Sequence, residues 1–422
     1  MKIIERNVVQ TFDRVMECFV DGEVYKRSPP TGPQEELATL SVEELKAIQQ
    51  TVYGEDLQAT GYSYSHIKII EDPQPKPVEF PKIQDLENLN VCGIDGSSQR
   101  VERATFYFIL ARASIVEFRY STVDLKPYFY NQTLDASAIL WVDGNVFSDR
   151  LNLFTQSLKT DNHGRANILA PLAKDRSLPF LVKHDPTKID KSPSSHAIGW
   201  AVKLQQGLEL ECLKKVPTDV PTVCIKDGPL FSTSVSPRDT LDGLYPIFAW
   251  NHHVLIAVSK RVKDSSLLVE ALQKNIPLRD FWFKDQNIND QTLRLVSTDS
   301  IILPRILKPG YRTPLMEALP VSRKAIVEDE PRLMPLSCYY LSRHRPHTYI
   351  RLEIPKFMYD KNAEQVEKAI SVVCWQHELG HKAPLVQVAA DERCQLQHEK
   401  TILERQTISH LHKNNLHFPE DY

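Results

Sequence analysis

The sequence lacks several features that would decide its class at once. Its seven cysteines are odd in number and form no Cys-x-x-Cys pair, which argues against a disulfide framework or a zinc ribbon. No apolar run approaches the length needed to cross a bilayer, and the residues that follow Met1 have no signal-peptide core. Internal repeats and low-complexity tracts are also missing. We therefore expect a cytoplasmic protein with reduced thiols and no membrane partner.

An excess of charge of either sign is also missing, since the formal net charge is only −3. A nucleic-acid-binding protein need not be basic overall, but its Lys and Arg side chains must then cluster around a cleft. The 422 residues leave room for two or three domains, or for one large domain with insertions. Hydrophobic residues make up 42% of the chain and charged residues 25%, so we expect a packed core.

The N-terminal part has the pattern of helices followed by a linker. Apolar residues at helical spacing predict an amphipathic helix over 1–22, and Ser41 is the expected N-cap of a second helix that ends near residue 52. Four prolines between 73 and 81 predict a semi-rigid extended linker. We therefore predict an N-terminal helical region over 1–85 and a second domain over 86–422.

The rest of the chain alternates strands and helices, which predicts an α/β fold. The order is strands first, then a helix with acidic residues, then further strands and closing helices. It resembles an RNase H-like core, in which a mixed central sheet is flanked by helices. The predicted strands lie at 89–95, 104–121 (long enough to be a hairpin), 222–227, 253–259 and 348–355, the helices at about 195–215, 363–379 and 385–412, and 122–190 reads as irregular.

Two of the predicted strands end in Asp-Gly, and these two acids carry the functional argument. The first segment ends at Asp95-Gly96 and the second at Asp227-Gly228. If the two strands are neighbours in one sheet, the carboxylates meet at one edge and repel each other, so the site favours a divalent cation. A pair of such cations is the usual means of phosphodiester hydrolysis. The alternative is that each Asp-Gly is only a turn, as Asp143-Gly144 illustrates.

Five short segments, in this order, resemble the NurA nuclease family over about residues 86–400. The N-terminal 85 residues fall outside the resemblance, and 120–195 looks like an insertion. The matching segments are Gly93-Ile94-Asp95-Gly96-Ser97, Ile225-Lys226-Asp227-Gly228-Pro229-Leu230, Ala257-Val258-Ser259-Lys260, Arg351-Leu352-Glu353-Ile354-Pro355, and Ala383-Pro384-Leu385 with Ala389-Ala390-Asp391.

The resemblance implies DNA hydrolysis that depends on Mn²⁺ or Mg²⁺, with a two-metal site. Asp95 corresponds to the family's first metal ligand and Asp227 to its later strand Asp. The family places a Glu on the intervening helix, for which Glu209 is the first candidate and Glu211 the second. These two lie about 200° apart around a helix, so only one can face the site. The resemblance also implies a homodimer that acts with a HerA-type hexameric ATPase on DNA ends, in repair or phage defence.

The C-terminal part departs from the family pattern. Many members carry Tyr-Pro and then Ala-His, where this chain has Ala383-Pro384 and Ala390-Asp391. Asp391 is itself a good ligand for a hard cation, although a solvated helix position is the alternative. Lys260 follows a predicted strand and is a candidate to bind a phosphate or the charge of the transition state, the alternative being a surface lysine.

A competing function is suggested by His377-Glu378-x-x-His381, the zinc metalloprotease signature. On a helix its two histidines face the same way and can hold zinc, with the Glu as general base. Gly380 is a natural helix C-terminus and Pro384 stops a helix, so His381 is expected near or beyond the end of the helix. A third possibility is a NurA-like adaptor that has lost activity and only docks onto an ATPase.

Overall fold

The computed structural model describes much of the chain after residue 62. The predicted helices at 1–22 and 41–52 lie outside the described residues. The described segments are 63–87, 89–103, 106–120, 127–143, 146–147, 152–156, 193–217, 220–230, 244, 247, 252–260, 265–283, 293, 298–345, 348–401 and 404–405.

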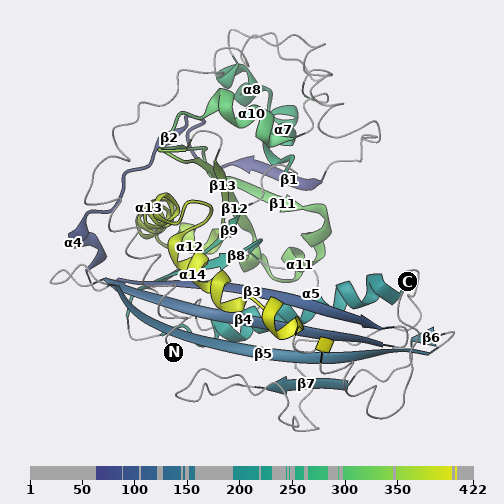
Figure 1. The fold of residues 1–422 in the computed structure, drawn as a ribbon. Helices are drawn as coiled ribbons and strands as arrows, with labels where there is room; N and C mark the ends of the chain where they lie inside the picture. The colour runs from purple at the N-terminus through teal and green to yellow at the C-terminus, as the bar shows by residue number, and fades with distance from the viewer. Residues whose placement is uncertain are drawn as a thin grey trace, which may run out of the picture.

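The centre of the molecule is a mixed sheet with the connectivity of an RNase H-like core (Figure 1). Strands β3 (Asn90–Arg103), β4 (Phe106–Tyr120) and β5 (Pro127–Asp143) form an antiparallel meander. Strand β8 (Thr222–Asp227) then pairs with β3 in parallel, and β9 (His253–Ser259) pairs with β8 in parallel. The spatial order β5-β4-β3-β8-β9 confirms the predicted fold class.

Further strands extend this core on the side of β9. Strands β13, β12, β11 and β1 follow β9 in antiparallel order, and the described strands join in one thirteen-stranded sheet. The sheet therefore includes strands from both sides of residue 85, because β1 pairs with β11. Their bounds are Tyr349–Pro355 (β13), Pro335–Leu341 (β12), Met316–Pro320 (β11), Tyr64–Ile69 (β1), Lys76–Pro77 (β2), Tyr311–Arg312 (β10), Val146–Phe147 (β6) and Asn152–Gln156 (β7).

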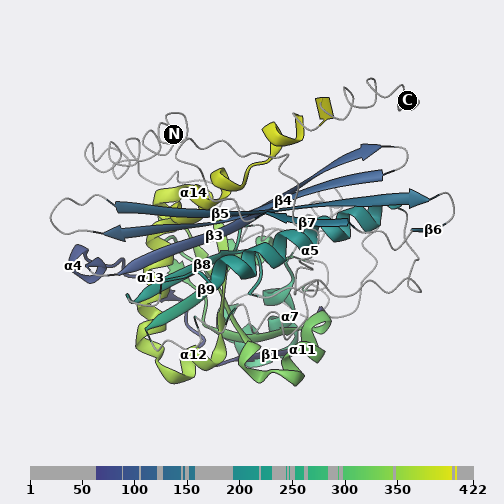
Figure 2. The same cartoon turned by 90° about the horizontal axis from the view of Figure 1, so that it is seen from below.

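Helices cover both faces of the central strands. Helix α5 (Pro193–Leu213) lies on one face of β3 and β4, and α14 (Leu385–Cys394) lies on the other (Figure 2). Because helices cover both faces, β8 and β9 are buried almost throughout, which explains their near-continuous apolar sequences. Helix α13 (Ala363–Gly380) packs against α14 and β9.

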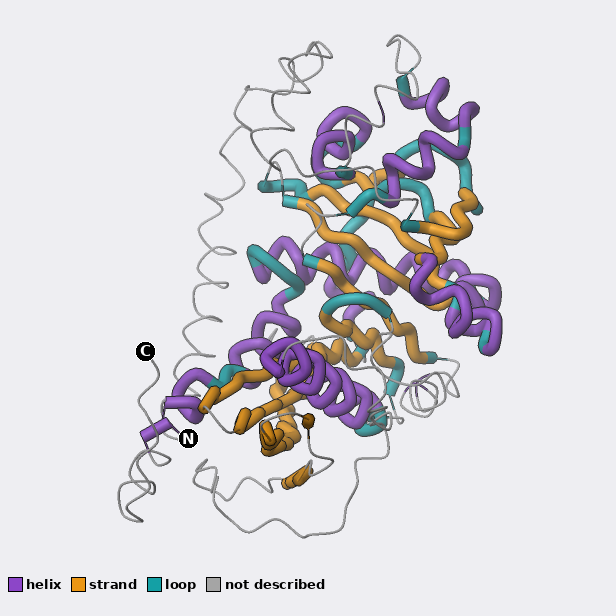
Figure 3. The backbone as a smooth tube through the Cα atoms, turned by 90° about the vertical axis from the view of Figure 1, so that its right-hand side faces the viewer, coloured by secondary structure: helices purple, strands orange, loops and turns teal. Residues whose placement is uncertain are grey.

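A second cluster of apolar side chains lies at the far end of the sheet from β3. It joins α7 (Leu267–Lys274), α8 (Ile276–Trp282) and α10 (Asp299–Ile306) to β1 and β11. Figures 1 and 3 show these helices together at the end of the molecule opposite β3–β5. The remaining described helices are α4 (Ile83–Leu86), α11 (Lys324–Asp329) and α12 (Lys356–Lys361), with 3₁₀ turns at Val321–Arg323 and Pro331–Leu333.

Three expectations about local structure were wrong. The stretch 104–121 is a single strand rather than a hairpin, and its hairpin partner is β3. The stretch 122–190 contains β5, whose polar central residues hide the strand pattern but whose backbone pairs with the whole length of β4. The last helix breaks after Cys394 and resumes at 397–401. The turn interpretation of Asp143 holds, because Asp143 pairs with Val146 across a hairpin.

The described cysteines agree with the expectation of reduced thiols. All six of them are buried and none forms a disulfide. Among the helices that the structure describes, none is long and apolar enough to span a membrane.

A glycine sets the distance between α14 and the central sheet. A Cβ atom at Gly93 on β3 would lie 2.4 Å from the carbonyl oxygen of Val386 and 2.9 Å from the backbone nitrogen of Gln387. Real Cβ atoms essentially never come this close to backbone atoms, so any side chain at this position must push α14 away from β3.

We therefore predict that Gly93→Ala destabilises the fold by about 1–3 kcal/mol, the usual cost of overpacking a core. Gly199→Ala is the matched control, because its Cβ meets nothing within 4 Å and it replaces a glycine inside a helix. This control is expected to be neutral or stabilising by up to about 1 kcal/mol. Urea unfolding measures both, and a Gly93→Ala variant as stable as the wild type would contradict the close approach.

Candidate functional site: carboxylates where β8 ends

The site lies at the point where β8 ends and β3 continues. The parallel pairing of these strands stops at Ile94 and Lys226, so Asp95 and Asp227 are the next residues on the two strands. Neighbouring strands lie about 4.8 Å apart, which puts the two acids side by side. Beyond Asp227, strand β3 has no neighbour on the β8 side and stays paired with β4. Side chains from both faces of the sheet can therefore approach the edge that β8 leaves open.

A lysine joins the two strand acids. Lys260 directly follows β9, and its Nζ lies 3.2 Å from Oδ2 of Asp95 and 3.0 Å from Oδ1 of Asp227. Burial lowers the pKa of Lys260, but the charges of Asp95 and Asp227 outweigh it and leave this pKa raised. Gln387 of α14 donates from Nε2 to Oδ1 of Asp227 at 2.6 Å. This amide holds the half-buried Asp227 from the face of the sheet that α14 covers.

The charges of all the other predicted acids act on Asp95. Its pKa is raised well above the usual range, first by burial and then by the charges of Asp227, Glu209 and Asp391, while Lys260 opposes the rise. The backbone N–H of Gly96 donates to its Oδ1 at 2.7 Å. Carboxyl groups from β8, α5 and α14 therefore all lie close enough to Asp95 for their charges to repel its own.

Glu209 reaches the site from helix α5. Its Oε2 lies 3.1 Å from Nζ of Lys226, both side chains are nearly fully buried, and Gln205 one turn earlier donates to its Oε1 at 3.1 Å. A Cβ atom at Gly96 would lie 2.7 Å from Oε1 of Glu209, so the glycine makes room for this carboxylate. Glu211 instead forms an ion pair with Lys214 at 2.5 Å.

Asp391 approaches from the opposite face, on α14. It is exposed, and it lies one helical turn after Gln387, so both residues belong to the side of α14 that faces the acids. Contacts with β3 and β4 fix the helix there. Sγ of Cys394 donates to the carbonyl oxygen of Asp95 on β3 at 2.9 Å, and Ser114 Oγ on β4 donates to the carbonyl oxygen of Ala390 at 3.1 Å.

Sequence reasoning missed the side chains that position the acids. Lys226 holds Glu209 and also donates to the carbonyl oxygen of Asp227 at 2.9 Å. Gln205 and Gln387 each precede a predicted site residue by four positions on the same helix. This i, i+4 spacing is the signal that would have found them. Lys226 is adjacent to Asp227, and only the alternation of strand side chains shows that it points to the α5 face.

The chemistry of these residues fits a divalent cation. Carboxylate oxygens are the preferred ligands of Mg²⁺ and Mn²⁺, and Oε1 of Gln387 adds an amide oxygen that is buried with no hydrogen-bond partner among the described residues. Within the part of the chain that the structure describes, no three acidic, His or Cys side chains come close enough together to hold an ion as they stand. Lys260 takes the position of a cation between Asp95 and Asp227.

The geometry of the His-Glu-x-x-His segment does not suit a zinc protease. Helix α13 ends at Gly380, and His381 is its C-cap with φ at 68°, so the two histidines do not share a helix face. The carboxylate of Glu378 accepts hydrogen bonds from Tyr340 Oη, Ser342 Oγ and the backbone N–H of Arg343, all within 2.9 Å. A carboxylate held in this way is an anchor for the loop after β12 rather than a general base.

Most of this chain is similar to known proteins. The family model described as the NurA domain matches residues 89–399. A solved structure, the NurA nuclease from Sulfolobus solfataricus, is similar with 11% sequence identity and a TM-score of 0.38, and the alignment covers 96% of this chain and 98% of that one. A comparison with curated proteins gave no match.

The burial of His377 predicts a pH-dependent stability. Its side chain is inaccessible to solvent and neither ring nitrogen has a hydrogen-bond partner among the described residues, so burial lowers its pKa from 6.5 to about 4. Between these two pH values the unfolded chain binds a proton that the folded chain does not. Acidification through this window therefore lowers the free energy of unfolding, by about 3 kcal/mol over its full width.

Urea unfolding of wild type and His377→Leu at pH 7.5 and 4.5 checks this prediction. The wild type should lose about 2–3 kcal/mol more than the variant on acidification. The exposed His252 provides the control substitution His252→Leu, which should keep the wild-type difference. An equal loss in wild type and His377→Leu would show that His377 does not carry the effect.

Proposed function

The chain belongs to the NurA domain family, and from this premise we propose that it is a divalent-metal-dependent nuclease that hydrolyses phosphodiester bonds of DNA. The observation that carries the proposal is that Asp95 and Asp227 end neighbouring strands, share Lys260, and lie near enough to Glu209 and Asp391 for all three other acids to raise the pKa of Asp95. Acids with a purely structural role are normally kept apart from one another. These acids come from four elements, and the charges of Asp227, Glu209 and Asp391 all raise the pKa of Asp95.

The residues of the chain have separate tasks in the proposed reaction. Asp95 and Asp227 would hold Mn²⁺ or Mg²⁺ between the two strands, with Glu209 and Asp391 as ligands from opposite faces. A bound cation of this kind lowers the pKa of a water and stabilises negative charge on the phosphate. Lys226 and Gln205 keep Glu209 directed toward the strands, and Gln387 does the same for Asp227.

Lys260 has a double task in this proposal. Without a substrate, its ammonium group neutralises Asp95 and Asp227. In the reaction, attack by water in line with the leaving oxygen adds negative charge to the non-bridging oxygens of the phosphate. Lys260 is close enough to the two acids to turn toward that charge, where a positioned cation stabilises the transition state.

The finer assignments extend the proposal and rest on the family resemblance. We propose that the protein works in the cytoplasm on DNA ends, as a homodimer that cooperates with a HerA-type hexameric ATPase, in repair or phage defence. The alternative of an inactive adaptor is less well supported, because the chain keeps four acids and the buried Lys226–Glu209 ion pair that holds one of them. Such a buried pair is costly to maintain for docking alone.

The first test is DNA cleavage with manganese by Asp95→Asn and Asp227→Asn. Each substitution removes a charge that the cation needs, so we expect each to reduce the rate at least about 1,000-fold while the protein stays folded. Asp360→Asn is the control, because Asp360 is an exposed acid on α12 that pairs with Lys356, and this variant should cut like the wild type. Cleavage at the wild-type rate by either Asp95→Asn or Asp227→Asn would contradict the proposed site.

A second test separates the two glutamates of α5. Glu209→Gln should reduce the cleavage rate about 100-fold or more and weaken Mn²⁺ binding, because the carboxylate that faces the strands is neutralised. Glu211→Gln is a matched control on the same helix two residues away, and it should stay within about twofold of the wild type. Calorimetric titration with Mn²⁺ provides the binding readout, and a larger effect at Glu211 would contradict the orientation of α5.

A further inference from the structure

Strand β3 continues well beyond the acids and leads away from them. It is paired with β8 only over 90–94, whereas its pairing with β4 extends to Arg103. Within the described strands, the segment 95–103 therefore has a neighbour on one side only. At about 3.4 Å per residue, this segment runs about 27 Å from the acids. A strand edge of this kind presents backbone groups as well as side chains to whatever lies beside it.

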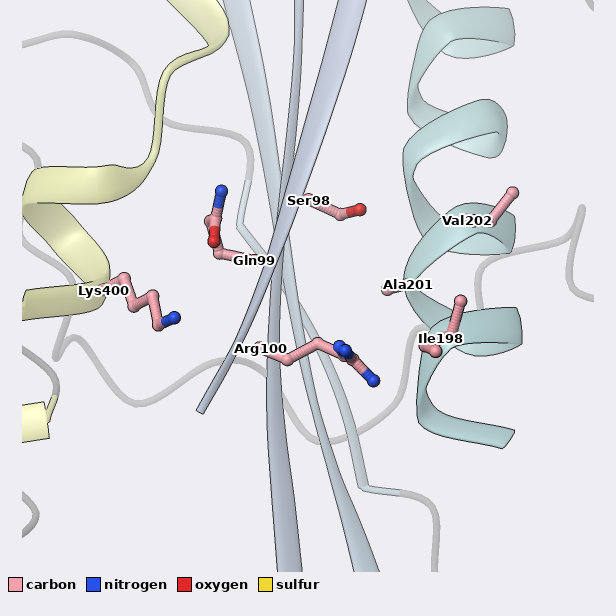
Figure 4. A pocket seen from close by; sticks show the side chains of 7 residues that line it. All are labelled: Ser98, Gln99, Arg100, Ile198, Ala201, Val202 and Lys400. Atoms are coloured by element: carbon pink, nitrogen blue, oxygen red, sulfur yellow. The ribbon is translucent and has the colours of Figure 1, made fainter. Parts of the chain in front are cut away.

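A cavity of about 420 Å³ lies on this extension (Figure 4). Strand β3 contributes Ser98, Gln99 and Arg100 to its lining, and helix α5 contributes Ile198, Ala201 and Val202. The helical turn at 397–401 contributes Lys400. In Figure 4 the side chain of Arg100 extends toward Ile198, while that of Lys400 points toward β3 from the other side. We call this cavity, defined by these seven residues, the β3 cleft.

The charge of the β3 cleft is opposite to that of the acid cluster. Among the described residues, its lining holds the guanidinium of Arg100 and the ammonium of Lys400 but no carboxylate. The acid next to Lys400 in the sequence, Glu399, lies 2.7 Å from Arg112, and Glu404 is 3.9 Å from Lys400. The cleft therefore suits a polyanion, and its side chains combine a cation pair with hydroxyl and amide donors.

Helix α5 contributes the apolar side chains of Ile198, Ala201 and Val202 to the cleft. Ile198 itself is 47% exposed, which offers an apolar contact beside the cations. This mixture of cations, polar donors and an apolar side chain is typical of sites that bind the sugar-phosphate backbone.

We propose that the β3 cleft binds the phosphodiester backbone of the DNA strand whose bond is cut at the acids, and that Arg100 and Lys400 contact its phosphates. This inference rests on the proposed function. Arg100 lies five residues beyond Asp95 on a continuous strand, about 17 Å away. At 3.4 Å per nucleotide along a duplex, this separation is about five nucleotides. Strand β3 is thus a rigid connection between the place of cutting and the place where the backbone is held.

The test measures DNA binding without metal, so that it does not depend on catalysis. A fluorescent single-stranded oligonucleotide of thymidines is titrated in EDTA at several salt concentrations with wild type, Arg100→Ser/Lys400→Ser and Lys324→Ser/Lys368→Ser. The last variant loses the same charge from two lysines on α11 and α13 that form exposed ion pairs. The salt dependence of binding is the slope of log K against log[salt]. Each lost phosphate contact reduces the magnitude of this slope by about 0.7 for a single strand.

We expect the β3-cleft variant to lose about 1.4 from this slope and to bind at least about tenfold more weakly at 0.1 M salt, while the control matches the wild type. Arg100→Gln and Lys400→Gln, tested singly, should each give about half of this change in slope. They replace the double variant in the test if that variant does not fold. An unchanged slope in a wild-type-like protein that cuts DNA would overturn the β3 cleft and leave the proposed function standing. A wild type that neither binds nor cuts DNA would overturn both.

Discussion

The register between β3 and β8 is the constraint on which the rest of the site depends. Their parallel pairing ends at Ile94 and Lys226, one residue before both acids, and β3 alone continues. A slip of one residue would turn every side chain of a strand to the other face and separate Asp95 from Asp227. Because β8 ends here, Glu209 from one face and Asp391 from the other can approach the same point, which a continuous sheet would prevent.

The cluster of like charges must be stabilised when no cation is bound, and the structure does so with two lysines and close packing. Lys260 neutralises the strand acids, and Lys226 neutralises Glu209 on the α5 face. The two glycines beside Asp95 let the helices come close: Gly93 admits the backbone of α14, and Gly96 admits the carboxylate of Glu209. Electrostatic repulsion within the site is thus offset by the same elements that position the acids.

The sequence predicted the mixed sheet from the order of its strands and helices, and it singled out Asp95 and Asp227 because two β-branched apolar runs both end in Asp-Gly. It ranked Glu209 before Glu211 only through the family resemblance, because the rotation of α5 relative to the sheet depends on tertiary packing. It also missed β5, whose polar residues break the alternation while the long edge of β4 supplies its hydrogen bonds. The His-Glu-x-x-His motif suggested a zinc protease because the sequence does not show the tertiary contacts of Glu378. In the fold, its carboxylate is held by Tyr340 and Ser342, which are far away in the sequence.

The most direct measurement for the central claim is a crystal structure with manganese, recorded at a wavelength where manganese scatters anomalously. We expect an anomalous peak between Asp95 and Asp227, with Glu209 or Asp391 in contact and with Lys260 moved away from at least one carboxylate. A peak at another place, such as His377 and His381, would contradict the account. So would the absence of a peak at the acids in a crystal where manganese is in excess and the acids are solvent-accessible.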